Sequence, residues 1–415
     1  MADASWTWMI YLATHNNAAE VGEESVARMR AGAASANVRV LVQQSTLEHT
    51  TRHIIGANPE IAADLGKIDS GAPETLLDFI RWAAKTAPAK RYALVLWSHG
   101  SGWAPSEMAR VAKQQPAAVP VTVGELTQRG ENDTAGQIFF SSSLAELLAQ
   151  PTPSERAIAF DDGSGHSLDT IELGRALAKA AQELGRPLDL VGMNACQMSS
   201  AEVAYQLRGS AEVYVASQED MPVQGWPYDD ILPRLAAQPD MDAATLGTLV
   251  VERYLAYFQT HQLPWGQDGL PAGVTLAATR LAGIPKLAGA VQSLAASLQG
   301  EIATLSDAIW AANAKAHKFK FQLYDLASFC RALAAAASGT PAADAANAVL
   351  TALADPTFML KCAHLGSAYD DTGGLTTYLL PPGTGTPISP YYAETAYAQA
   401  TAWGAFLAAY HAAVA

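Results

Sequence analysis

A histidine and a cysteine in this sequence each come directly after a short apolar segment. His99 follows YALVLWS, and Cys196 follows LDLVGMNA. A cysteine attacks carbonyl carbon as a thiolate, an imidazole moves the proton, and backbone N–H groups stabilise the oxyanion that forms. A lone cysteine is more often an inert core residue. The two residue types therefore predict nucleophilic acyl transfer only if the fold brings them to one site.

Two neighbouring features suit the same chemistry. A helical pattern begins near Ser199, and the positive end of a helix lowers the pKa of a thiol that precedes it. Gly100 follows His99, and a glycine lets the backbone come close to a substrate carbonyl. We therefore expect the backbone amides of Gly100 and Cys196 to be the oxyanion donors.

The elements that must position these residues are expected to be strands of a parallel sheet. Apolar segments predict strands at 7–13, 37–44, 92–98, 188–194 and 211–217. Amphipathic patterns predict helices near 20–33, 73–86, 168–184 and 198–208. Helices between consecutive strands indicate an α/β fold with helices on both faces of the sheet. Because ligands bind outside the carboxyl ends of such strands, His99 and Cys196 are expected at one edge.

The chain divides into two expected regions. Residues 1–250 carry the alternation of strands and helices and are expected to form the catalytic domain, interrupted by a long insertion at 104–160. Residues 251–415 are rich in alanine, which favours helices. We expect this second region to be mainly helical, with strands near 273–279 and 373–381.

Composition narrows the classes of function. The chain of 415 residues has a formal net charge of −14, which argues against nucleic acid or a membrane surface as partner, since either would need a basic face. Three cysteines do not suggest a disulfide framework, and Cys330 and Cys362 lie in apolar patterns typical of core helices. The N-terminal residues lack the features of a signal peptide. The expectation is a cytoplasmic protein, or a secreted one if a leader is missing; the oligomeric state is not indicated.

An oxygen-rich segment, DDGSGHSLD, is the one candidate for a metal site. Asp161, Asp162 and Asp169 could hold calcium, although the segment also suits the start of a helix. No histidine or cysteine spacing matches a zinc motif. The predicted chemistry requires no cofactor.

Several motifs, taken in order, resemble a known family. WTWMIYLATHNN, WSHGSGW, NACQMSSAEVAY and GGLTTYLLP are similar to segments of the clostripain-like cysteine peptidases, family C11 of clan CD. The resemblance implies a caspase-like three-layer α/β sandwich with a mainly parallel central sheet. It also implies a cysteine endopeptidase that acts on protein or peptide substrates through an acyl-enzyme, with His99 as general base and acid and Cys196 as nucleophile.

One residue beside the nucleophile departs from the family pattern. Members resembling clostripain carry Asp two residues before the cysteine, where it selects a basic P1 residue; here the residue is Asn194. An amide does not give a basic side chain the full charge-assisted pairing. We expect a P1 preference that is basic but weakened or altered, with Asn194 lining the pocket. Glu219, Asp220 and Asp229 are expected to supply negative charge, and Trp226 an aromatic wall, with core packing as the alternative for the tryptophan.

The resemblance also bears on activation. In the family, the segment between the two catalytic residues is where activating cleavage occurs after a basic residue. Lys113, Arg129 and Arg156 are the candidate sites, and an unprocessed surface loop is the alternative.

Two other functions compete with the peptidase. A catalytically impaired pseudo-peptidase would act as a binding module; Asn194 favours this, whereas the retained His99, Gly100 and Cys196 argue against it. An α/β-hydrolase esterase is suggested by HGSGW, but that fold needs a G-x-S-x-G elbow, which the sequence lacks.

Overall fold

The protein is described from a computed structural model. The structure describes residues 4–14, 16, 18–32, 36–46, 48–56, 60–103, 158–159, 161, 167–261, 273–383 and 388–414.

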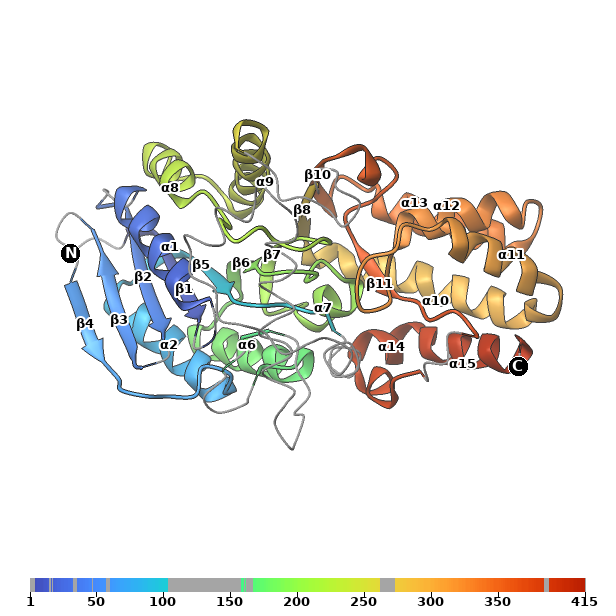
Figure 1. The fold of residues 1–415 in the computed structure, drawn as a ribbon, viewed down its shortest axis with the longest axis horizontal. Coiled ribbons are helices and arrows are strands. Elements are labelled where there is room, and N and C mark those ends of the chain that lie inside the picture. Colours follow the sequence, from blue (N-terminus) through green and yellow to red (C-terminus); the bar gives the residue numbers. More distant parts are fainter. Residues whose placement is uncertain are drawn as a thin grey trace.

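Within this part of the chain, a sheet of nine strands runs through the molecule in the order β10-β8-β7-β6-β5-β1-β2-β3-β4 (Figure 1). Its strands are β1 (Ala4–Ala13), β2 (Val38–Ser45), β3 (Thr50–Ile55), β4 (Glu60–Asp64), β5 (Ala89–Trp97), β6 (Leu188–Asn194), β7 (Ala211–Ala216), β8 (Val274–Arg280) and β10 (Met359–Leu365). The five central strands, β2, β1, β5, β6 and β7, pair in parallel. Antiparallel strands extend the sheet at both ends.

The side chains of β1 explain why the sheet is covered on both faces. All ten residues of this strand are buried. Successive side chains of a strand point to opposite faces, and here Trp8 and Ile10 belong to one hydrophobic core while Met9 and Tyr11 belong to the other. The protein is therefore a three-layer α/β sandwich with a core on each side of the sheet.

Helices from along the whole chain make up the outer layers. One core includes residues of α1 (Ala19–Gly32), α8 (Tyr228–Ala237) and α9 (Ala243–Thr260). The other includes residues of α2 (Pro73–Thr86), α6 (Thr170–Leu184) and α7 (Ala201–Gln206). Asp169 caps the N-terminus of α6, and its carboxylate accepts the N–H of Glu172 at 2.6 Å in a capping box.

The later helices gather at one end of the molecule, on the right in Figure 1. They are α10 (Ile284–Gly300), α11 (Ile302–Lys315), α12 (Leu326–Ala336), α13 (Pro341–Leu353), α14 (Ala396–Thr401) and α15 (Trp403–Val414), with short 3₁₀ turns at Leu281–Gly283, Ser367–Tyr369 and Pro390–Glu394. A two-stranded sheet of β9 (Leu323–Asp325) and β11 (Thr376–Tyr378) lies between these helices and the main sheet. Thr376 donates its N–H to the carbonyl of Ser199 at 2.9 Å, so β11 contacts the segment that follows Cys196.

The fold class expected from the sequence is confirmed: a caspase-like α/β sandwich with a mainly parallel sheet and a largely helical C-terminal region. Cys330 is buried in α12, as expected. The helix expected around Cys362 is wrong, because this residue lies in β10 and pairs with Ala277 of β8. An apolar run of this length suits a strand as well as a helix, and only the partner strand decides between them.

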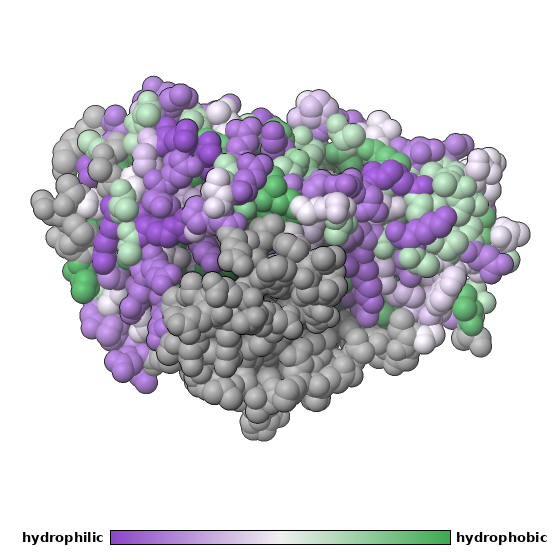
Figure 2. Space-filling model, turned by 45° about the horizontal axis from the view of Figure 1, so that its top comes forward, coloured by the Kyte–Doolittle hydropathy of each residue, from purple (hydrophilic) through white to green (hydrophobic). Residues whose placement is uncertain are grey.

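The expected division at residue 250 falls inside α9, and the main sheet takes β8 and β10 from beyond it. The division into two regions stays a prediction. In the described chain, no helix is long and apolar enough to cross a membrane. Figure 2 shows hydrophilic residues over most of the described surface on the face that it draws, with hydrophobic residues in small groups.

Candidate active site

Two neighbouring strands carry the histidine and the cysteine to the same edge of the sheet. Strands β5 and β6 pair in parallel, with Trp97 opposite Asn194. His99 comes two residues after Trp97, and Cys196 comes two residues after Asn194. Neighbouring strands lie about 4.8 Å apart. The register therefore brings both residues into adjoining loops at the carboxyl edge.

These two loops pack directly on each other through glycine. A Cβ atom on Gly100 would overlap the carbonyl oxygen of Cys196. Gly102 has a φ of +67°, which favours glycine, and a Cβ there would lie 3.0 Å from the carbonyl oxygen of Gln197. A larger residue at either position would push the histidine loop away from the cysteine loop.

The residue after the cysteine is held in a costly backbone conformation. Gln197 has a φ of +60°, a region that residues with a side chain rarely adopt. Its side-chain amide donates to the carboxylate of Asp220 at 3.2 Å, which anchors the loop. Backbone strain of this kind is concentrated at functional sites.

The thiol of Cys196 is covered by the loop that follows β7. Its side chain is buried, and the N–H of Met221 donates to Sγ at 3.1 Å. Burial, followed by the negative charge of Asp220, raises the pKa of this thiol well above its ordinary value; the Met221 N–H and the Lys320 ammonium act in the opposite direction. The cysteine is therefore a neutral thiol at neutral pH.

His99 is buried as well, and burial shifts its pKa in the opposite direction. Burial lowers the pKa of this imidazole to about 3, because the imidazolium form is the one that needs water. A neutral imidazole can accept a proton, as a general base must.

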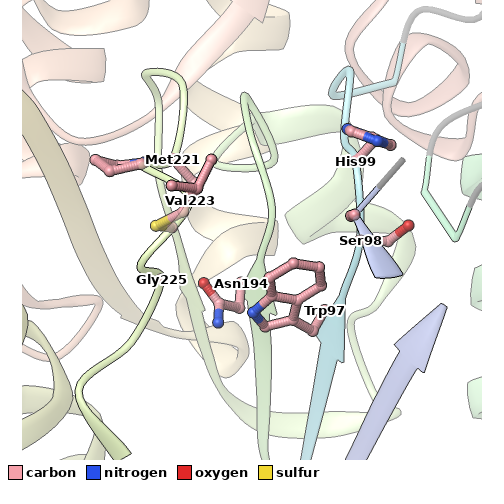
Figure 3. A pocket seen from close by; sticks show the side chains of 9 residues that line it. Trp97, Ser98, His99, Asn194, Met221, Val223 and Gly225 are labelled. Carbon is pink, nitrogen blue, oxygen red and sulfur yellow. The ribbon is translucent and has the colours of Figure 1, made fainter. Parts of the chain in front are cut away.

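A small cavity of about 10 Å³, room for about one water molecule, opens beside the histidine (Figure 3). Its lining residues are Ala18, Trp97, Ser98, His99, Asn194, Met221, Pro222, Val223 and Gly225. Figure 3 shows Asn194 and Trp97 at the ends of their strands, with His99 on one side and Met221 and Val223 on the other.

Asn194 is buried against this cavity. Its amide nitrogen donates to the hydroxyl of Tyr228 at 3.2 Å, whereas its amide oxygen, Oδ1, has no hydrogen-bond partner among the described residues. Gly225, with a φ of +56°, faces the amide, and a Cβ there would lie 2.6 Å from Nδ2. The glycine thus leaves room for the Asn194 side chain.

The three carboxylates predicted near this site do not line the cavity. Asp229 forms an ion pair with Arg28 at 3.0 Å on the surface. Asp220 forms an ion pair with Lys320. The third, Glu219, accepts the hydroxyl of Tyr369 at 2.9 Å, and burial together with the charge of Asp220 raises its pKa.

Trp226, the residue predicted as an aromatic wall, does not lie at this cavity either. Trp226 is fully buried, and its ring occupies the space that a Cβ on Gly192 of β6 would need. It does not line the cavity, because its side chain is packed in the core beneath the sheet edge.

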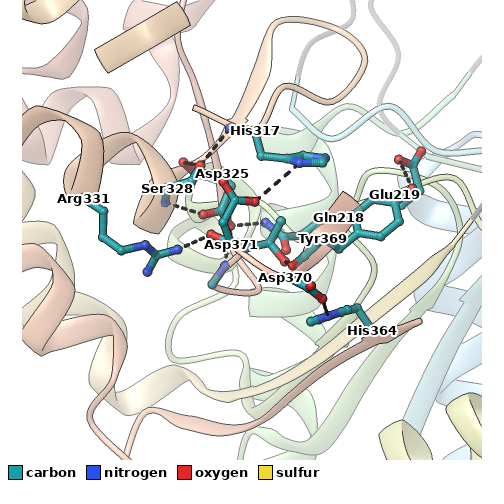
Figure 4. A network of polar contacts seen from close by, with 12 residues as sticks. Gln218, Glu219, His317, Asp325, Ser328, Arg331, His364, Tyr369, Asp370 and Asp371 are labelled. Atoms are coloured by element: carbon teal, nitrogen blue, oxygen red, sulfur yellow. Dashed lines mark hydrogen bonds and ion pairs between the residues drawn. The ribbon is translucent and has the colours of Figure 1, made fainter. Parts of the chain in front are cut away.

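A polar network ties the loop after β7 to the C-terminal region (Figure 4). Asp325 is fully buried and accepts the side-chain amide of Gln218 at 2.9 Å, the N–H of Gly373 at 2.7 Å and the N–H of Ser328 at 2.6 Å. Sequence reasoning missed Asp325 along with Lys320 and Tyr369. Each lies at least 100 residues from the residue it contacts in this loop, and no short motif marks such a pairing.

The suggested calcium ligands have other partners where the structure describes them. Asp161 accepts the N–H of Ser70 at 2.7 Å and its hydroxyl at 2.8 Å, and Asp169 caps α6. The described ranges contain no group of three or more histidine, cysteine, aspartate or glutamate residues that could hold a metal ion. Asp162 and the predicted processing sites lie outside the described residues; those sites are Lys113, Arg129 and Arg156.

Comparison with known proteins agrees with this fold. The edge of a caspase-like sheet that carries a cysteine and a histidine defines a class of cysteine peptidases. The model of the clostripain family, Peptidase_C11, matches residues 10–115 and 131–408. The chain belongs to the clostripain family and is a cysteine peptidase, and this family implies protein or peptide substrates. A search of curated proteins finds no match.

Solved structures share the fold over nearly their whole length. One is a secreted C11 cysteine protease from Bacteroides thetaiotaomicron in complex with an irreversible peptide inhibitor, with a TM-score of 0.66, 17% identity, and coverage of 96% of this chain and 99% of that one. A second is an inactive zymogen C11 protease from Parabacteroides distasonis, with a TM-score of 0.63, 17% identity, and coverage of 97% and 99%. A third is the secreted Bacteroides thetaiotaomicron protease iotapain, with a TM-score of 0.66, 15% identity, and coverage of 97% and 100%.

The expected cytoplasmic location is wrong. Two of these similar structures are of proteases described as secreted, which conflicts with that expectation. The expectation depended on the N-terminal residues and on the sparse cysteines, and neither property fixes where a folded peptidase works.

Proposed function

We propose that this chain is an endopeptidase in which Cys196 and His99 act as a catalytic dyad. The register of β5 and β6, with Gly100 seated on the Cys196 carbonyl, is the observation that carries the proposal. His99 takes the thiol proton as Sγ bonds to the peptide carbonyl carbon, and the backbone amides of Gly100 and Cys196 are the proposed donors to the oxyanion.

Each later step returns the proton. The imidazolium of His99 protonates the leaving amine as the C–N bond breaks, which leaves a thioester on Cys196. Water then attacks the thioester while His99 accepts its proton, and the thiol is restored as the acid product leaves. No step needs a cofactor.

We propose further that the described state is a resting form. Met221 donates to Sγ and the thiol is buried, so a substrate carbonyl reaches Cys196 only after the loop after β7 has moved aside. That a C11 protease with a similar fold is an inactive zymogen supports this proposal. Cleavage after Lys113, Arg129 or Arg156, by a second peptidase that accepts basic residues, is the proposed trigger.

The test is labelling by peptidyl acyloxymethylketones, followed by mass spectrometry, alongside cleavage of a proteome-derived peptide library. We expect one inhibitor molecule on Cys196, no label and no cleavage with Cys196→Ala, and at least a hundredfold loss with His99→Ala. Cleavage by the Cys196→Ala variant would overturn the proposal.

Two outcomes would favour the competing functions. Labelling of a serine by a fluorophosphonate, with Cys196 unmodified, would favour an esterase. Binding of peptides without labelling or cleavage would favour a pseudo-peptidase.

A further inference from the structure

Among the described residues, the floor of the cavity beside His99 carries an unpaired hydrogen-bond acceptor and no negatively charged side chain. Oδ1 of Asn194 is buried without a partner among the described residues, while the amide nitrogen is held by Tyr228. In Figure 3 the amide oxygen lies on the side of Met221, and the nitrogen lies on the side away from it. A buried acceptor that lacks a hydrogen-bond donor raises the free energy of the unbound protein. A ligand that supplies this donor removes that penalty and binds more tightly as a result.

We infer that this pocket selects a P1 residue with an uncharged side-chain amide, glutamine or asparagine, whose N–H₂ group donates to Oδ1 of Asn194. The inference rests on the proposed function, because P1 is defined only for a peptidase that uses Cys196. It names the substrate class for that same site.

The charges around the pocket disfavour a basic P1 residue. A buried cation needs a carboxylate, and the described residues that line the cavity include none. Two carboxylates of the loop after β7, Glu219 and Asp220, already hold Tyr369 and Lys320. During the reaction His99, which lines the cavity, becomes an imidazolium and adds repulsion to any cation bound there.

The other classes of P1 residue are disfavoured for separate reasons. An apolar side chain leaves Oδ1 of Asn194 unpaired, and a carboxylate places negative charge against it. An amide brings a donor together with an apolar stem, which Trp97 and Val223 can contact at the sides of the cavity. The closed cavity holds about one water molecule, so the P1 side chain takes the space that Met221 and Val223 now cover.

A matched series of peptides that differ only at P1 tests the inference. The residues to compare are glutamine, asparagine, methionine, glutamate, lysine and arginine, with kcat/KM measured for each on the full chain. We expect glutamine or asparagine to exceed methionine, lysine and arginine by about tenfold or more, since a site built to hydrogen-bond a group rejects analogues that lack it. Methionine is the matched apolar control for glutamine.

A substitution at the floor supplies a second test. Asn194→Asp places a carboxylate where the unpaired oxygen lies, so we expect kcat/KM for lysine and arginine to rise about tenfold or more relative to glutamine. Asn347→Asp, in an exposed position of α13, adds the same charge away from the site and should leave the P1 order unchanged.

The outcomes separate this inference from the function on which it rests. Cleavage best after lysine or arginine, or equal cleavage of all peptides, overturns the P1 inference and keeps the peptidase. If no peptide is cleaved and Cys196 takes no acyloxymethylketone label, even after limited cleavage of the chain by trypsin, which cuts after lysine and arginine, the proposed function fails and the inference fails with it. The wild-type series decides the matter even if the Asn194→Asp variant does not fold.

Discussion

Burial acts on the two proposed catalytic side chains in opposite directions. It lowers the pKa of the His99 imidazole to about 3 and raises the pKa of the Cys196 thiol, so both shifts favour the neutral form. In the proposed resting form the proton stays on sulfur, and the proposed mechanism transfers it only when the site opens to substrate. The sequence analysis suggested both residues and a helix end that would lower the pKa of the thiol. In the structure α7 begins only at Ala201, and burial raises the pKa of the Cys196 thiol.

The histidine makes a testable contribution to stability. Between pH 6.5 and 3 the unfolded chain binds a proton at His99 that the folded chain refuses, so the free energy of unfolding falls as the pH falls. His99 alone changes the free energy of unfolding by about 1.4 kcal/mol per pH unit in that window. We expect His99→Gln to remove this part of the slope in urea unfolding from pH 4 to 6.5. Parallel curves for the two proteins would contradict the pKa shift.

Gly100 offers a second test at the residue scale. In Gly100→Ala the new Cβ overlaps the Cys196 carbonyl, so we expect a loss of about 3 kcal/mol in the free energy of unfolding and loss of peptidase activity. Gly289→Ala in α10 is the matched control, because nothing lies within 4 Å of its Cβ. It should gain about 0.5–1 kcal/mol through helix propensity. Equal stability of the two variants would mean that the loops are not in contact.

At the scale of elements, the parallel centre of the sheet and the neighbouring strand β8 were predictable, whereas β3, β4 and β10 were not. The apolar segments gave β6 at its observed bounds and β1, β2, β5 and β7 to within a few residues. Strands β3 and β4 lack a continuous apolar run, because they lie at one end of the sheet. Pairing between distant elements, such as β11 with the loop after Cys196, depends on tertiary contact and leaves no periodic signal.

The polar network behind the site gives a prediction at this scale. Asp325→Ala leaves the donors of Gln218, Ser328 and Gly373 without their buried acceptor, and we expect a loss of about 3 kcal/mol in urea unfolding. Because Gln218 belongs to the loop that covers Cys196, alkylation of this thiol by iodoacetamide should become faster. Asp344→Ala, in the exposed first turn of α13, is the control and should cost less than about 1 kcal/mol. Unchanged alkylation with Asp325→Ala would show that the network does not hold the loop.

The whole molecule is joined across the division that composition suggested. One hydrophobic core contains residues of α2 and α6 together with residues of α10 to α15, and β8 and β10 extend the sheet that carries the site. The change in alanine content near residue 250 therefore marks a change in helix content, and the sheet continues beyond it. Composition reports helix propensity, whereas shared burial decides which elements fold together.

The last prediction follows from this shared core. We expect the full chain to unfold in one transition, with far-UV circular dichroism and tryptophan fluorescence giving the same midpoint. A fragment of residues 1–250 should not fold cooperatively, because it cuts α9, lacks β8 and β10, and exposes the core residues that pack on α10. The two fragments 1–250 and 251–415, mixed after separate expression, supply the control, since they should regain acyloxymethylketone labelling of Cys196 only together. Cooperative unfolding of 1–250 alone would show instead that the site belongs to a self-sufficient domain.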